Sequence, residues 1–304
     1  MPAERRSAAP GADVSAAGPA ITYSGIGDEA GPTLADQVGA IQELGWPAIE
    51  LRTVDRVAIA DLTADAFARV VTAVGAAGLA VSCVDSRIGN WGRTIATALD
   101  EDIRELDVLG RRCAELGTRF VRVMSYPNAG LDPDDWGRLV IDRMRILAEH
   151  AEQLGLVLLH ENCAGWAGRS GPRMLRMIHE VDSPALRLLF DTGNGIAYGY
   201  DAFSLLETIV DQVAYVHVKD GVGDTTGQEY TLPGAGRCRL ADCLGLLLRR
   251  GFTGTWSIEP HVLLRPHDGH DRTAEVDGVA EFVAYGRRLE RLVRQEILTA
   301  GRAS

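Results

Sequence analysis

One pattern recurs from residue 21 onward: a short run of apolar and β-branched residues, a few loop residues, and then an amphipathic helix. This periodicity predicts strands at residues 21–26, 47–51, 79–84, 119–124, 156–161, 186–191, 213–218 and 255–259. It predicts helices at residues 33–45, 63–77, 97–117, 133–154, 170–180, 201–210, 239–250 and 274–298. Several of the helices end at a glycine, as in ELGWPAIEL and QLGLVLLHE, where the left-handed backbone of a helix C-cap is tolerated.

Eight strand–helix units in a chain of 304 residues predict an α/β fold of one domain, a (β/α)8 TIM barrel. A doubly wound open sheet is the rival fold, and it usually has fewer strands and a glycine-rich phosphate loop after the first one. Here the first turn reads GIGDEAG, with Ala30 where the last glycine of GxGxxG would stand. We therefore expect a barrel over residues 20–300, preceded by a disordered leader at residues 1–19 that is rich in Ala, Pro, Gly and Ser.

Four of the apolar runs end in a residue that can bind a cation: Glu161, Asp191, His217 and Glu259. A charge at the end of a buried strand is costly unless something pairs with it. In a barrel, the carboxyl ends of consecutive strands meet on one face, and neighbouring strands are about 5 Å apart. For each residue alone, capping its own strand remains the simpler interpretation. Together, these oxygen and imidazole donors favour Mn, Mg, Co or Zn in an open catalytic site over a structural zinc.

Composition narrows the classes of function. The formal net charge of −11 argues against an enzyme that acts on nucleic acid, because phosphate backbones are repelled. The five cysteines are odd in number and match no CxxC or disulfide framework, so we expect reduced thiols and a cytoplasmic location. No stretch is long and apolar enough to cross a membrane, and we expect no membrane partner.

The segments HENC, FDTGN, VHVKD, LPGAGR and GFTGTWSIEPH resemble the sugar phosphate isomerase/epimerase family, whose fold is a xylose isomerase-like TIM barrel. That group includes ketose 3-epimerases, hydroxypyruvate isomerases, inosose dehydratases and apurinic endonucleases. The resemblance extends over residues 21–265. It implies that Glu161, Asp191, His217 and Glu259 hold one divalent metal ion, with Mn²⁺ favoured and Mg²⁺, Co²⁺ or Zn²⁺ as alternatives. It also leaves a homo-oligomer open.

The resemblance implies an isomerase or epimerase that acts on a small sugar, keto-sugar or polyol derivative. Glu161 and Glu259 would be the catalytic residues: one removes a proton next to a carbonyl, the metal stabilises the enediolate, and the other returns a proton. A dehydratase or lyase would use the same metal and base. A barrel that has lost catalysis is a further alternative, and so is an apurinic endonuclease. The endonuclease needs many more His and Asp ligands, whereas the first four predicted strands contain no histidine.

Departures from the ketose 3-epimerases affect the expected substrate. Asn194 stands where those enzymes usually carry a histidine, and their arginine after the seventh strand has no clear counterpart in DGVGDTTG. Asn90 replaces the lysine of an SPIGK-like segment. Six residues are nevertheless candidates for contact with substrate, each with a structural role as the alternative: Asn194, Lys219, Arg237, His261, Trp166 and Arg52. Alternation along a strand points His160 away from the metal.

Overall fold

The computed structural model describes residues 21–262, 264–265, 270–271 and 277–303. The leader expected at residues 1–19 and the start of the helix expected at 274–298 lie outside the described residues.

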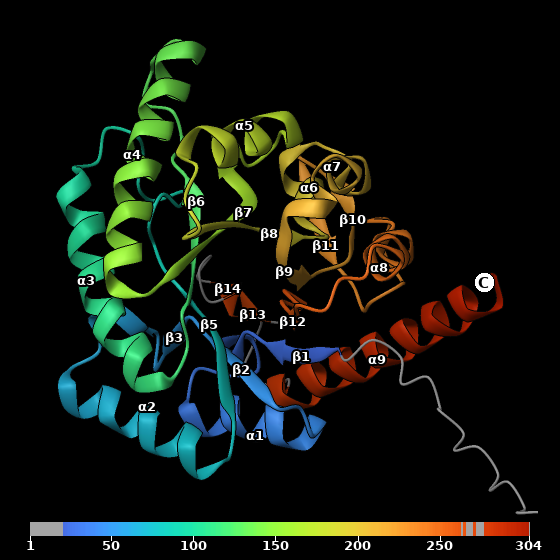
Figure 1. Cartoon of the computed structure of the whole chain (residues 1–304). Coiled ribbons are helices and arrows are strands. Elements are labelled where there is room, and N and C mark those ends of the chain that lie inside the picture. Colours follow the sequence, from blue (N-terminus) through green and yellow to red (C-terminus); the bar gives the residue numbers. More distant parts are fainter. Residues whose placement is uncertain (1–20, 263, 266–269, 272–276, 304) are drawn as a thin grey trace, which may run out of the picture.

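Eight parallel strands form one sheet in the order β1-β12-β9-β8-β7-β6-β5-β2 (Figure 1). A parallel bridge between Ile26 and Glu50 links its two ends. The predicted (β/α)8 TIM barrel is confirmed, and the predicted strands agree with the observed ones to within a residue or two at most ends, apart from the longer β7. The strands are β1 (Thr22–Gly25), β2 (Ala48–Leu51), β5 (Ala80–Asp85), β6 (Phe120–Ser125), β7 (Val157–Gly165), β8 (Leu186–Asp191), β9 (Val213–Val218) and β12 (Thr255–Ile258).

Helices surround the strands as an outer layer (Figure 1). Thr33, Thr63 and Asp132 accept hydrogen bonds from backbone N–H groups in the first turns of α1, α2 and α4. Gly45 and Gly155 end α1 and α4 in the left-handed conformation, with φ of 65° and 71°. The helices are α1 (Leu34–Leu44), α2 (Ala64–Ala76), α3 (Leu99–Leu116), α4 (Pro133–Leu154), α5 (Gly171–Val181), α7 (Ala202–Ile209), α8 (Leu240–Arg249) and α9 (Gly278–Ala303).

The core has two layers that follow from the alternation of side chains along each strand. Residues such as Leu158 and Phe190 belong to the large cluster shared by the strands and the helices. A smaller cluster of Cys83, Leu159, Leu189 and Tyr215 fills the barrel itself. Glu161 is two residues beyond Leu159, so it lies on the inner face, above this apolar plug. His160 directly precedes Glu161, so its side chain points to the opposite face of β7 and belongs to the outer layer.

Short elements that the sequence did not predict line the carboxyl end of the barrel. They occur in the segments after the strands, where no hydrophobic period of strand or helix is long enough to be recognised. They are β3 (Thr53–Val54) with β4 (Val57–Ala58), α6 (Asn194–Tyr198), β10 (Gly221–Asp224) with β11 (Gly227–Tyr230), and β13 (Leu264–Arg265) with β14 (His270–Asp271).

All five cysteines are buried and none forms a disulfide. Within the described ranges, no helix has both the length and the apolar composition required to cross a bilayer.

Candidate active site

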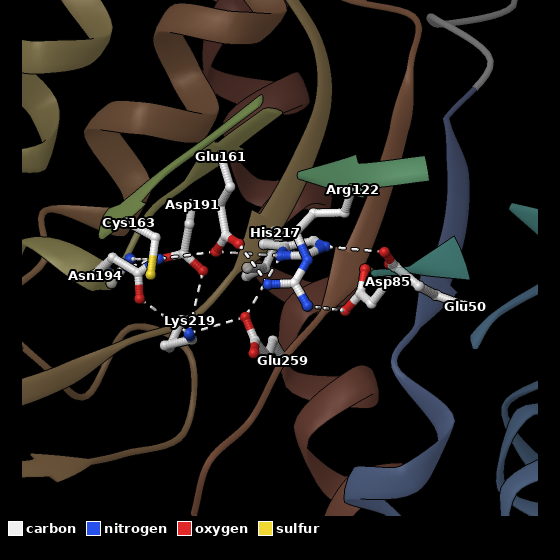
Figure 2. Close-up of polar contacts among 12 residues, drawn as sticks. Glu50, Asp85, Arg122, Glu161, Cys163, Asp191, Asn194, His217, Lys219 and Glu259 are labelled. Carbon is white, nitrogen blue, oxygen red and sulfur yellow. Dashed lines mark hydrogen bonds and ion pairs between the residues drawn. The ribbon is translucent and has the colours of Figure 1, made fainter. Parts of the chain in front are cut away.

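The structure brings together the four side chains that end the last four barrel strands. One donor atom from each of Glu161, Asp191, His217 and Glu259 lies within 4.8 Å of the others, and all four residues are buried. Figure 2 shows them converging from the ends of neighbouring strands. Parallel pairing aligns Asp191 with His217, and His217 with Ser257, which is two residues before Glu259. Adjacent strands therefore deliver the donors at similar depth.

Among the described residues, Asp191 Oδ2, His217 Nδ1 and Glu259 Oε2 make no hydrogen bond of good geometry, although Lys219 Nζ lies within ion-pair distance of the two carboxylate oxygens. His217 Nδ1 is 3.4 Å from Glu259 Oε2 and 3.7 Å from Glu161 Oε1. Buried polar atoms without partners are uncommon in folded proteins. Carboxylate and imidazole donors that face one point fit a divalent cation, and the residues present therefore suit the expected metal.

Glu50 contacts His217 on the side of the imidazole ring that faces away from the other three donors, and it orients the ring. His217 Nε2 donates to Glu50 Oε1 at 3.0 Å, and Tyr215 Oη donates to Glu50 Oε2 at 2.8 Å. This contact leaves Nδ1 directed at the other three donors. Burial disfavours the imidazolium, but Glu50 and the neighbouring glutamates outweigh it and raise the pKa of His217 well above its usual value. A metal ion at Nδ1 would take the place of that proton.

Each of the two glutamates is held by a different arginine. Arg122 Nη1 donates to Glu161 Oε2 at 3.2 Å, and Asn194 Nδ2 donates to Glu161 Oε1 at 2.8 Å. Burial opposes ionisation of Glu161, but His217 and Arg122 outweigh it and lower its pKa to about 2. Arg52 Nη1 donates to Glu259 Oε1 at 2.9 Å. Both glutamates are therefore carboxylates at neutral pH.

Lys219 joins Asp191 to Glu259. Its Nζ is 3.3 Å from Asp191 Oδ2 and 2.8 Å from Glu259 Oε2. Burial of Glu259 is outweighed by the charges of Lys219 and His261, which hold its pKa well below the usual range. Burial raises the pKa of Asp191 to about 6, although Lys219 acts in the opposite direction. The ammonium of Lys219 therefore balances part of the negative charge of the carboxylate cluster.

The site opens into a cavity that contains several of the predicted substrate-binding residues. Asn194, Lys219 and His261 line this cavity, whereas Arg52 lies outside its lining, bound to Asp28 and Glu29. The lining consists of Trp91, Arg122, Met124, Glu161, Cys163, Asn194, Ala197, Tyr198, Lys219, Gln228, Tyr230, Glu259 and His261.

Two predicted residues lie elsewhere. Arg237 lines a separate hollow with Thr192 and Asp201. Trp166 is 3% exposed and lines a hollow beside the catalytic cavity. Trp166 is therefore absent from the lining of the cavity that contains the metal donors.

Sequence reasoning missed Arg122 and Asp85. Arg122 Nη2 is 3.2 Å from Asp85 Oδ2, and its Nη1 reaches Glu161, so the guanidinium connects two strands inside the barrel. The signal was present as an arginine within the apolar run RFVRVM, since a charge inside a buried strand requires partners.

Comparison with known proteins gives matches to one family. The sequence model of the family described as xylose isomerase-like TIM barrel matches residues 38–276. An inosose dehydratase of Geobacillus kaustophilus is 32% identical over 90 residues, which are 30% of this chain and 29% of that protein. A 3-dehydroshikimate dehydratase of Pseudomonas putida is 27% identical over 168 residues, or 53% of this chain and 26% of that protein.

Among solved structures, that of an L-ribulose 3-epimerase has a TM-score of 0.72 at 16% identity and covers 93% of this chain and 98% of the other. This match shows a shared fold. The stretches matched in the two dehydratases span less than a third of the length of those proteins.

Proposed function

Since this chain belongs to the xylose isomerase-like TIM barrel family, we propose that it is a divalent-metal-dependent isomerase or epimerase of a small sugar, keto-sugar or polyol derivative. The observation that supports this most directly is the meeting of four buried donors from four neighbouring strands within 4.8 Å. Two of the four are glutamates, the residue type that can also move protons. The family contains both epimerases and dehydratases among the proteins similar to this chain.

The metal would be held by Glu161, Asp191, His217 and Glu259, with Mn²⁺ as the proposed ion. When bound, it would supply Lewis-acid polarisation of a substrate carbonyl. The donor set contains no thiolate, because Cys163, the cysteine that lines the cavity, is not among the clustered donors. Burial raises the pKa of its thiol.

Glu161 and Glu259 would carry the proton transfer. One carboxylate removes the proton from the carbon next to a carbonyl, and the electron pair moves toward the carbonyl oxygen to give an enediolate. The other glutamate, which is ionised at neutral pH, first takes up a proton from the solvent and then returns it to the opposite face of the same carbon, or to its neighbour. Arginine contacts restrict each carboxylate, since Arg122 holds Glu161 and Arg52 holds Glu259. Restricted carboxylates keep their position relative to a bound sugar.

Asn194, Lys219 and His261 are the proposed contacts to substrate. Asn194 Oδ1 accepts from Lys219 Nζ at 3.2 Å, so the two side chains form one polar wall of the cavity. His261 lies on the Glu259 side, where its Nε2 is 3.5 Å from Glu259 Oε1. Amide, ammonium and imidazole groups suit the recognition of sugar hydroxyls.

Dehydration is the second candidate reaction. It is favoured by the names of the curated relatives and by Lys219, a buried cation 2.8 Å from Glu259, which could protonate a departing hydroxyl. In this case the base removes the same proton, and water leaves from the neighbouring carbon. We also propose a cytoplasmic setting, which the five buried, unpaired cysteines support.

Solvent exchange tests the proposal and separates the two reactions. The Mn²⁺-loaded protein is incubated in D2O with a panel of ketoses and ketocyclitols, and the products are followed by NMR and mass spectrometry. Deuterium incorporation without loss of water indicates isomerisation or epimerisation, whereas loss of water indicates dehydration. Exchange that persists in excess chelator would contradict the metal dependence.

Glu161→Gln and Glu259→Gln should each reduce turnover by at least a hundredfold, because an amide cannot accept the proton. Exposed Glu207→Gln is the matched control and should keep full activity. Circular dichroism checks that the fold is intact. Full turnover in either active-site variant would refute the assigned role.

A further inference from the structure

A second hollow adjoins the catalytic cavity. The two share Trp91 and Tyr198 as lining residues. The second hollow is also lined by Trp136, Trp166, Arg169 and Arg173. Strand β7 connects the two spaces, since it carries Glu161 and leads directly into Trp166. A ligand bound at the metal donors could therefore extend into the second hollow.

The lining of this hollow has the opposite charge to the chain as a whole. It contains two arginines and no carboxylate, in a protein whose formal net charge is −11. Neither Arg169 nor Arg173 is paired with an acidic side chain in the part of the chain that the structure describes. For comparison, Arg176 on the same helix as Arg173 is paired with Glu180 at 2.6 Å.

Aromatic rings hold the two guanidinium groups in place. The guanidinium carbon of Arg169 lies 4.7 Å from the centroid of the Tyr198 ring, and that of Arg173 lies 5.5 Å from the Trp166 ring. Arg173 Nη1 also donates to the Trp166 carbonyl at 3.2 Å. A guanidinium stacked in this way keeps other N–H donors available, and its planar fork matches carboxylate and phosphate oxygens.

The catalytic cavity offers no comparable site for an anion. Its cations are already bound to acidic side chains: Arg122 to Glu161 and Asp85, and Lys219 to Asp191 and Glu259. A negatively charged substituent would meet several carboxylates there. The adjoining hollow shares two lining residues with the cavity, and its two arginines have no acidic partner among the described residues.

We propose that this hollow is a substrate subsite for an anionic substituent, a phosphate or a carboxylate, of the sugar whose reacting carbons lie at Glu161 and Glu259. The inference rests on the proposed function for the location of the reacting carbons. Arg169 and Arg173 bind the anion, and Trp166 supports Arg173. The buried indole fits because Gly137 on α4 has no side chain, and a Cβ there would come within 2.7 Å of the ring.

Three ketoses that differ only at carbon 6 test the subsite: D-fructose, D-fructose 6-phosphate and D-fructuronate. Binding to the Mn²⁺-loaded full chain is measured by calorimetry and by tryptophan fluorescence, because three tryptophans line the hollow. We expect at least one anionic probe to bind tenfold or more tightly than D-fructose. In the R169Q/R173Q double variant this ratio should fall at least tenfold, whereas Arg145→Gln, a matched control outside the hollow that is paired with Asp142, should preserve it.

The two anionic probes distinguish a phosphate from a carboxylate. Equal affinity for all three probes would overturn the proposal, and so would an equal loss in the Arg145→Gln variant. Repeating the binding with Glu161→Gln separates this inference from the proposed function. Anion preference that survives in Glu161→Gln would support the subsite independently of catalysis. A wild-type protein that prefers the anionic probes but exchanges no proton with any ketose would support the subsite while the catalytic assignment fails.

Discussion

At the scale of single residues, the active site depends on partners that hold each functional group in one orientation. Glu161 and Glu259 each contact their own arginine, and His217 contacts Glu50. These partners come from β2, the loop after β2, and β6, which is the neighbour of β7 in the sheet. Two consequences can be tested by substitution.

Glu50→Ala should weaken Mn²⁺ binding about 10- to 100-fold, because His217 loses the carboxylate that directs Nδ1 at the metal. Glu50→Gln keeps a hydrogen-bond acceptor and should lose less. Tyr215→Phe removes the 2.8 Å hydrogen bonds that the Tyr215 hydroxyl makes with Glu50 and Ser82, but it keeps the contact between Glu50 and His217, and it is the matched control. Metal titration by calorimetry gives the affinities, and saturating Mn²⁺ should restore much of the activity. Wild-type affinity in the alanine variant would contradict the orienting role.

His160 should make folding stability depend on pH. Burial lowers its pKa to about 4 from an ordinary 6.5, so between these values the unfolded chain binds more protons than the folded one. This contribution to stability is complete above pH 6.5 and is lost as the pH falls toward 4. The difference corresponds to roughly 3 kcal/mol.

His160→Leu should remove this dependence. Urea denaturation at pH 7 and pH 4.5, with chelator in both buffers, gives the free energies of unfolding. The wild type should lose about 2–3 kcal/mol more than the variant between the two pH values. An equal loss in both proteins would show that His160 does not titrate in this range.

At the level of secondary-structure elements, β7 contributes both to the donor cluster and to the adjoining hollow. Its nine residues include Glu161, and its end at Gly165 places Trp166 against α4. Gly165 has a φ of 97°, and a Cβ there would come within 2.3 Å of the Ser125 backbone. The strand can therefore pass close to β6 before the chain turns outward only because this position is a glycine.

Gly137→Ala should destabilise the protein by about 1–3 kcal/mol, because the added methyl group overlaps the buried indole of Trp166. Gly39→Ala in α1 is the matched control, since nothing lies within 4 Å of its Cβ position. Higher helix propensity should stabilise that variant by up to about 1 kcal/mol. Thermal and urea unfolding measure both changes, and stabilisation of both variants would contradict the packing argument.

At the scale of the whole molecule, the proposed metal connects the last four strands of the barrel. Donors from β7, β8, β9 and the end of β12 would be linked through one ion, and a ligand that binds only the folded state stabilises it. The closed sheet does not itself require the ion, because its strands are joined by their own parallel pairing.

Adding Mn²⁺ to chelator-treated protein should raise the melting temperature by several degrees, since an ion at a hundred times its Kd contributes about 2.7 kcal/mol. Removing the metal should abolish activity while circular dichroism shows the fold retained. Mass spectrometry of the loaded protein should find about one divalent ion per chain. Asp191→Asn should reduce the thermal shift, and an unchanged shift in that variant would argue against this site.

The barrel and the four donor residues could be predicted from the sequence alone. The apolar pattern of the strands located their ends. The alternation of side chains along a strand predicted that Glu161 lies on the inner face of the barrel and His160 on the outer face. This information is local, because a donor at the end of a parallel strand reaches the carboxyl face of a barrel whatever its partners are.

The side chains that contact the donors could be identified only from the tertiary structure. Closure of the sheet brings Glu50 from β2 to His217 on β9, and the pairing of β6 with β7 brings Arg122 to Glu161. Loop paths placed Trp166 in the adjoining hollow and Arg237 in a third one. These contacts depend on strand register, on how closely the backbones approach, and on side chains that extend between residues distant in the chain. The hydrophobic pattern within one segment contains no information about them.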